Sequence, residues 1–251
     1  GSTGGAGIGS GENANYSGTV TINGGVVYAE GGADSTRIGS GKPAIGTSDN
    51  GAFTTGTGGN AVIVAPDGIG DPSGFADWDG IFINYEGSNT SATVGEDGTV
   101  HLNDTEANIQ VWGEPVIDYP LVVGSGTELR VVQNDRNYAY ATLEIGQDGK
   151  LTNNGTVTVD EGSTLILREG LDRTDGSGTL ECTGTVKLPP EDKLIALSGA
   201  EDLTYNGTEQ RPEVSVTLNL WGYSHTYGYP ADYTVTYTDA TNAGETAKAV
   251  V

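Results

Sequence analysis

Three aspartates and a tryptophan form the motif in this chain with the most obvious chemistry. Asp77-Trp78-Asp79 directly precedes Gly80, and Asp71 lies upstream in the same polar segment. Paired carboxylates are the groups that most glycoside hydrolases use for acid–base chemistry, and an aromatic ring beside them can stack on a sugar. The same carboxylates are hard oxygen ligands, so Asp71, Asp77 and Asp79 are candidate ligands for Ca²⁺, the one cofactor that the composition favours. The structural alternative is that Trp78 covers a core while the aspartates form Asx turns.

A second group of candidate residues is aromatic. Trp221, Tyr223 and Tyr227 crowd one segment that is expected to be an exposed hairpin or loop, and Trp112 lies near a predicted strand end. Aromatic side chains at this density form binding platforms for glycans or proteins, or alternatively the core of a small domain. The predicted ligand-binding residues are Asp77, Trp78, Asp79, Trp112, Trp221, Tyr223 and Tyr227.

No complete catalytic set accompanies these residues. The chain has two histidines, and neither His101 nor His225 stands in a Gly-His-Gly motif. The 11 basic residues are spread thinly, so the sequence offers no Lys and Arg cluster beside candidate calcium carboxylates. We therefore predict a protein without enzymatic activity. A polysaccharide lyase or hydrolase using Asp77 and Asp79 is the alternative.

The elements that must position these residues are predicted to be short strands. Apolar, β-branched runs recur between Gly, Asn and Asp residues, a pattern typical of strands joined by tight turns. No window shows a convincing helical period. The sequence therefore predicts an all-β protein, with strands at residues 20–22, 61–64, 80–83, 121–123, 129–132 and 156–159.

Repeats indicate how these strands are arranged in residues 1–188. Ile8-Gly9 and the two residues after it recur at Ile38-Gly39, and 41 glycines are spread over the 251 residues. A short strand with a corner every few residues cannot bury its inner face alone, whereas stacked coils bury it in a continuous core. We predict a right-handed parallel β-helix, a β-solenoid, with glycines at its corners. A β-sandwich or jelly roll is the competing architecture.

Residues 189–251 are predicted to form a second domain. Pro189 and Pro190 mark the joint, because proline blocks both a helix and a central strand. Period-2 alternation in the segments that follow is typical of an antiparallel sandwich. The chain stops within an expected strand, so we predict a small immunoglobulin-like β-sandwich that is truncated at its C-terminus.

Charge and composition exclude several partners. The formal net charge is −23, which repels phosphate backbones, so nucleic acid is not an expected partner. No apolar stretch reaches the roughly 18 residues of a membrane span, and we expect no membrane insertion in this segment. One cysteine allows no disulfide framework. The lack of methionine indicates a piece of a larger protein, and we expect a monomer.

Two segments resemble known families. Residues 203–214, together with Asn242-Ala243-Gly244, resemble the immunoglobulin-like repeats that occur in tandem on bacterial surface proteins. Four motifs resemble the β-helical repeat regions of very large secreted proteins of gut Firmicutes, and the match covers most of residues 1–188. These motifs are Gly4–Gly9, Val20–Gly25, Gly59–Ile63 and Leu151–Val157. These resemblances imply a secreted or cell-wall-attached module of a bacterial surface adhesin, without catalytic activity, that binds host or dietary glycans or host surface proteins. A purely structural stalk is the other alternative.

Overall fold

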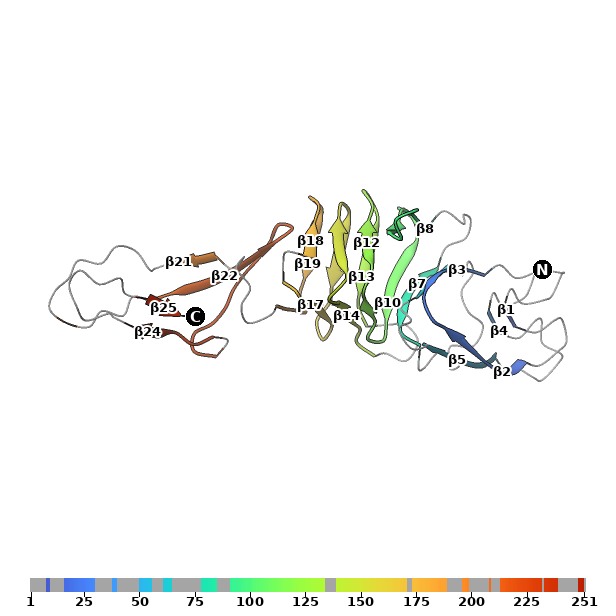
Figure 1. Ribbon diagram of the computed structural model, residues 1–251, viewed down its shortest axis with the longest axis horizontal. Coiled ribbons are helices and arrows are strands. Elements are labelled where there is room, and N and C mark those ends of the chain that lie inside the picture. Colours follow the sequence, from blue (N-terminus) through green and yellow to red (C-terminus); the bar gives the residue numbers. More distant parts are fainter. Residues whose placement is uncertain are drawn as a thin grey trace. The chain divides into compact units, whose positions relative to one another are not determined.

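The protein is described by a computed structural model, in which strands are the regular elements (Figure 1). This confirms the predicted all-β class. Among the described residues, no helix is long and apolar enough to cross a membrane. The chain divides into two compact units, Gly1–Pro190 and Glu191–Val251, called unit 1 and unit 2 here. The described residues are 8–9, 16–29, 38–39, 50–55, 61–64, 78–84, 91–133, 139–170, 173–188, 196–198, 208, 213–231, 233–238 and 248–250.

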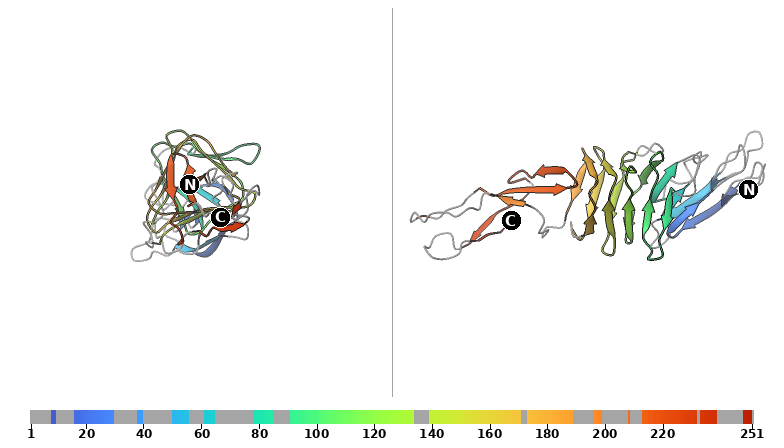
Figure 2. Two further views of the ribbon diagram at one scale, coloured as in Figure 1. Left: turned by 90° about the vertical axis from the view of Figure 1, so that its left-hand side faces the viewer. Right: turned by 90° about the horizontal axis from the view of Figure 1, so that it is seen from above.

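The second half of unit 1 contributes strands to three sheets, which the chain visits in strict rotation. Strands β9, β12, β15 and β18 pair in one sheet, β10, β13, β16 and β19 in another, and β11, β14, β17 and β20 in the third. These neighbours are all parallel. Figure 2 shows these green to orange strands side by side in successive rows. The bounds are β9 Val100–Leu102, β10 Asn108–Trp112, β11 Val116–Ile117, β12 Pro120–Val123, β13 Glu128–Val131, β14 Thr142–Ile145, β15 Lys150–Asn153, β16 Thr156–Val159, β17 Thr164–Leu167, β18 Thr174–Asp175, β19 Thr179–Cys182 and β20 Thr185–Lys187.

Alternation along each strand sends every second side chain into the interior. In β16, Val157 and Val159 are buried, whereas Thr156 and Thr158 point outward and remain partly exposed. Because the strands pair in register, buried residues stack into columns of like side chains. Full burial of one such aliphatic side chain contributes about 1.5–3 kcal/mol. One column consists of Ile109, Leu129, Val157 and Leu180.

Glycine is required where the backbone of one three-strand repeat passes close to the backbone of the next. A Cβ on Gly155 would overlap the carbonyl oxygens of Thr127 and Gly124 in the preceding turn. The buried Asn153 fixes the same corner, because its amide donates to the Thr179 carbonyl at 2.9 Å and its Oδ1 accepts from the Gly155 N–H at 3.1 Å. The Asn153-Asn154-Gly155 segment thus ties three successive turns together.

The first half of unit 1 also contains parallel pairs: β1 with β4, β2 with β5, β3 with β6, and β6 with β7. The Ile8-Gly9 repeat lies in register, since Ile8 pairs with Ile38 and Gly9 with Gly39. The bounds are β1 Ile8–Gly9, β2 Tyr16–Ile22, β3 Gly25–Tyr28, β4 Ile38–Gly39, β5 Asn50–Thr55, β6 Ala61–Val64 and β7 Gly80–Asn84.

The strand direction reverses between the two halves of unit 1. Strand β7 is antiparallel to its partner β10, and β8 (Ala92–Val94) is antiparallel to its partner β9. The β10 sheet continues through β7, β6 and β3, so two oppositely directed sets of strands share it. Uniform parallel stacking was expected throughout residues 1–188, and this antiparallel junction differs from it.

Unit 2 contains antiparallel strands. β21 (Ala196–Ser198), β22 (Ser215–Leu220) and β23 (Tyr223–Thr226) form one sheet, and β24 (Thr236–Thr238) pairs with β25 (Lys248–Val250). Trp221 and Gly222 make the two-residue turn between β22 and β23, with φ of 47° and 80°. Positive φ at both turn residues matches the right-handed twist of the flanking strands.

Candidate functional site

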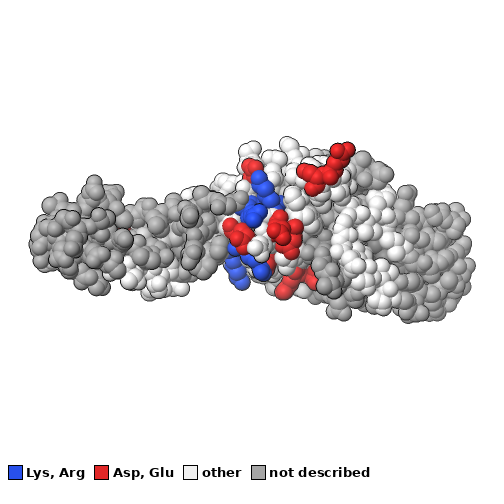
Figure 3. Space-filling view, viewed as in Figure 1, with Lys and Arg blue, Asp and Glu red and all other residues white. Residues whose placement is uncertain are grey.

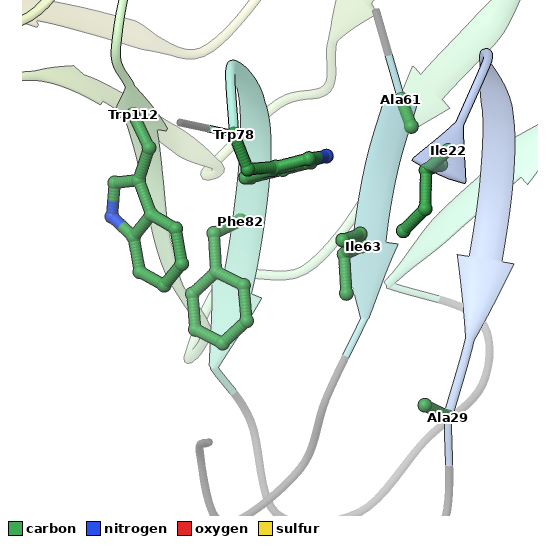
Figure 4. Packing of buried hydrophobic residues seen from close by; sticks show 7 residues of the cluster. All are labelled: Ile22, Ala29, Ala61, Ile63, Trp78, Phe82 and Trp112. Atoms are coloured by element: carbon green, nitrogen blue, oxygen red, sulfur yellow. The ribbon is translucent and has the colours of Figure 1, made fainter. Parts of the chain in front are cut away.

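The structure places Trp78 and Trp112 inside an aromatic cluster at the β7–β10 junction. Trp78 is 2% exposed and Trp112 6%. Their ring centroids lie 5.9 Å apart at 89°, and Phe82 stacks on Trp112 at 3.9 Å and 15° (Figure 4). Rings buried to this degree present no face on which a sugar could stack. The hydrophobic cluster comprises Ile22, Ala29, Ala61, Ile63, Trp78, Phe82 and Trp112.

Backbone geometry explains why Trp78 packs here. The Trp78 ring lies against Gly80, where a Cβ would come within 2.5 Å of both that ring and the Ala61 carbonyl oxygen. Gln110 is buried beside the cluster, and its Oε1 accepts from the Trp112 Nε1–H at 3.2 Å. The cluster covers the face of the β10 sheet opposite Ile81 and Ile83, so the junction is buried on both faces.

Asp79 acts as a cap for the turn that follows Trp112. Its Oδ1 accepts the Glu114 backbone N–H at 2.9 Å, across 35 residues of sequence. The carboxylate occupies the space that a Cβ on Gly113 would fill. Asp71 and Asp77 lie outside the described residues, so the predicted Asp71, Asp77 and Asp79 set is represented only by Asp79.

Other described aspartates also bond to nearby backbone and hydroxyl groups. Asp104 accepts the N–H groups of Glu106 and Ala107 at 3.0 and 3.2 Å and the Ser91 hydroxyl at 2.5 Å. The Asp97 carboxylate accepts hydrogen bonds from the Thr99 N–H and from the Thr99 hydroxyl, and these bonds lower the pKa of the Asp97 carboxyl. Within the described parts of the chain, no three His, Cys, Asp or Glu side chains form a group that could hold a metal ion.

A group of neighbouring aromatic side chains lies on β23 of unit 2 and on the residue that follows it. Tyr223 and His225 have nearly parallel rings, 3° apart with centroids at 6.2 Å, and His225 contacts Tyr227 edge-on at 4.9 Å and 83°. His225 is exposed and the two tyrosines are half-buried. We call Tyr223, His225 and Tyr227 the aromatic row.

The register of the hairpin explains how the row is held. Leu218 pairs with His225 and Leu220 with Tyr223, and directly paired residues share a face of the sheet. The row therefore borders the buried aliphatic side chains of β22, along a strand at the edge of this sheet. Ser224 and Thr226 occupy the opposite face, where the Thr226 and Thr217 hydroxyls bond at 3.2 Å.

Two further tyrosines follow the row in sequence. Tyr229 is 64% exposed and its ring lies 5.6 Å from that of Tyr233. The Tyr233 hydroxyl donates a hydrogen bond to the Val214 carbonyl, which anchors this ring to the start of the β22 segment.

Basic side chains in the described part of unit 1 are interspersed with acids. Lys150 Nζ lies 3.0 Å from Asp175 Oδ2, and Arg168 pairs with Glu144. Figure 3 shows blue and red groups side by side on the drawn face. Such mixing provides no continuous cationic surface for a polyanion on that face.

Of the predicted binding residues, Tyr223 and Tyr227 are brought together, while Trp221 forms the adjoining turn. Sequence reasoning missed His225 as a member of this group. The available signal was spacing: Tyr223, His225 and Tyr227 alternate with Ser224 and Thr226, and alternation places them on one face of a strand.

No protein-family model, curated protein or solved structure gives a significant match to this chain.

Proposed function

We propose that this chain is a non-catalytic glycan-binding module of a bacterial surface adhesin, secreted or attached to the cell wall. The observation that carries the proposal is the aromatic row, in which the His225 ring contacts Tyr223 on one side and Tyr227 on the other, at the edge strand β23 and the residue after it. Aromatic rings arranged in a row offer apolar surfaces to successive sugar units of a glycan. The tyrosine hydroxyls and the histidine imidazole add hydrogen-bonding groups. The bacterial surface location rests on the sequence resemblance.

The scaffold that we propose for unit 1 is a parallel β-helix. Its support is the rotation of strands β9 to β20 through three sheets with parallel register. For unit 2 we propose an immunoglobulin-like sandwich, supported by its antiparallel pairs.

A cross-link tests the β-helix. Thr142 and Thr164 are paired Cα partners in adjacent turns, and neighbouring strands lie about 4.8 Å apart, within the Cα separation that a disulfide spans. In a Cys182→Ser background, T142C/T164C should oxidise to an internal disulfide. T142C/T152C, whose positions belong to different sheets, should not. Failure of the first pair to oxidise would contradict the proposal.

Glycan binding is tested by substitution of the row. The full chain should bind members of a glycan array or mucin, and Tyr223→Ala/Tyr227→Ala should weaken that binding at least about tenfold, equivalent to roughly 1.4 kcal/mol. Ser224→Ala is the matched control, because Ser224 lies on the opposite face of the same strand. Flat responses of the unmodified chain to both probes would remove the ligand claim, and unchanged affinity in the double variant would remove the aromatic row as the binding site.

A structural spacer is the second candidate function. It is favoured by the cluster around Trp78 and by Asp79, because these residues of the Asp77-Trp78-Asp79 motif stabilise the junction.

The enzymatic alternative makes a different prediction. If it held, wild type supplied with calcium would release products from acidic glycans, and Asp77→Asn would abolish that release.

A further inference from the structure

Tyr140 is an exposed aromatic ring that the backbone holds in place. It precedes β14 and is 54% exposed. A Cβ built on Gly162 would lie 2.6–2.7 Å from three adjacent carbons of the Tyr140 ring. Near-equal distances to three ring carbons mean that one face of the ring, rather than its edge, covers Gly162.

The fold fixes both partners of this contact. The Thr164 N–H donates to the Ala141 carbonyl at 3.0 Å, which aligns the residue after Tyr140 with the turn that contains Gly162. Gly162 has φ of 86°, and the Ser163 N–H donates to the Asp160 carbonyl at 2.9 Å to close that turn. A ring already packed on backbone has less rotational freedom to lose when something binds it.

The turn that the ring covers carries two carboxylates. Asp160 and Glu161 belong to the same turn as Gly162, and both are exposed. Carboxylates accept hydrogen bonds from hydroxyl groups, whereas they repel anionic sugars. The net charge of −23 adds to that repulsion.

We propose that Tyr140, flanked by Asp160 and Glu161, is a binding site in unit 1 for neutral hexose glycans. The ring receives the apolar face of a pyranose, and the carboxylates accept hydrogen bonds from its hydroxyls. This site extends the proposed glycan binding to a second surface, formed by different residues from those of the aromatic row.

The experiment uses the full chain carrying Tyr223→Ala/Tyr227→Ala, so that failure at the aromatic row and failure at Tyr140 are distinguishable. An array of neutral hexose oligosaccharides is probed first, and the strongest binder is titrated by calorimetry. We expect saturable binding that Tyr140→Ala weakens at least tenfold and Tyr140→Phe retains. Hexagalacturonate should bind at least tenfold more weakly than the neutral glycan. Absence of binding, equal affinity in Tyr140→Ala, or binding restricted to cationic chitosan oligomers would each overturn the proposal.

Gly162→Ala tests whether the held ring matters, because its methyl group would push the Tyr140 ring away from the turn while position 140 remains a tyrosine. Gly126→Ala is the matched control: Gly126 also has positive φ, at 78°, but its nearest side-chain neighbour is the Thr105 methyl group at 3.0 Å. We expect reduced affinity in Gly162→Ala and unchanged affinity in Gly126→Ala, with folding of both checked by circular dichroism. Equal affinity in the two variants would overturn the role of the held ring.

Discussion

In the Asp77-Trp78-Asp79 motif, Trp78 and Asp79 have structural roles that their residue types alone did not indicate. Trp78 looks like a sugar-stacking residue in the sequence, yet its ring lies in the junction core beside Trp112. Asp79 looks like an acid, a base or a metal ligand, yet its Oδ1 accepts a backbone N–H. A signal for burial was present in the strand that pairs with β7: residues 61–64 are consecutively apolar, which is typical of a strand buried on both faces.

Replacement of Asp79 tests its capping role. Asp79→Ala removes the acceptor for the Glu114 N–H, and we expect a loss of about 0.5–1.5 kcal/mol in the free energy of unfolding, measured by urea denaturation. Asp79→Asn keeps an amide oxygen at the site, so it should lose less. If millimolar calcium stabilised wild type but not Asp79→Asn, the residue would be a metal ligand and the capping explanation would be insufficient.

At the scale of elements, much of the strand pattern could be predicted. The expected strands at residues 61–64 and 156–159 coincide with β6 and β16, because alternation or continuous apolar character marks them clearly. Corners were predictable from glycine. Which glycines are indispensable was not, because close approach depends on the turn stacked above, as it does at Gly155.

Gly155→Ala should therefore destabilise unit 1. Its methyl group would overlap the Gly124 and Thr127 carbonyl oxygens, and overpacking of this kind typically costs about 1–3 kcal/mol. Asn154→Ala, at the exposed neighbouring position, should change stability by no more than about 0.5 kcal/mol. Thermal unfolding of both variants makes the comparison, and equal melting temperatures would show that the corner relaxes freely.

The ion pair between neighbouring strands β15 and β18 gives a titration prediction. The Lys150 ammonium and the Gly176 N–H lower the pKa of the Asp175 carboxyl from its ordinary 3.8. Lys150→Met should raise that pKa toward 3.8 without fully restoring it, because the Gly176 bond remains. Carboxyl NMR titration measures the shift.

The sign of the stability effect follows from the lowered pKa. Asp175 contributes stability above its unfolded-state pKa, and that contribution is lost as the pH falls through the folded-state value. Lys150→Met should therefore flatten this part of the acid dependence. An unchanged pKa in the variant would mean that Lys150 does not act on Asp175 in solution.

At the scale of the whole molecule, the reversal of strand direction was not predictable. Period-2 alternation looks the same for a strand running in either direction, so neither β7 nor β10 carries a signal for antiparallel pairing. The proposed binding surfaces were only partly predictable for a related reason. Alternation places side chains on a face, but whether Tyr140 packs on Gly162 depends on the register between turns.

The net charge of −23 predicts a response to salt. Raising NaCl from about 0.01 M to about 0.15 M shortens the screening length from about 30 to about 8 Å. Repulsion between like charges then weakens, and the melting temperature should rise. Choline chloride should act equally, since the effect is not specific to the cation. A falling melting temperature would indicate that ion pairs such as Lys150–Asp175 outweigh the repulsion.

The antiparallel junction also bears on how such a protein can change over generations. Strands β12 to β17 each pair with the strand three places before and the strand three places after them, so an in-frame duplication or deletion of three successive strands preserves the register on both sides. Each event would lengthen or shorten this half of unit 1 by about 4.8 Å. The β7–β10 pair tolerates no such event, because its aromatic core joins strands of opposite direction. Length can therefore evolve in fixed steps away from the junction, while the junction itself stays constant.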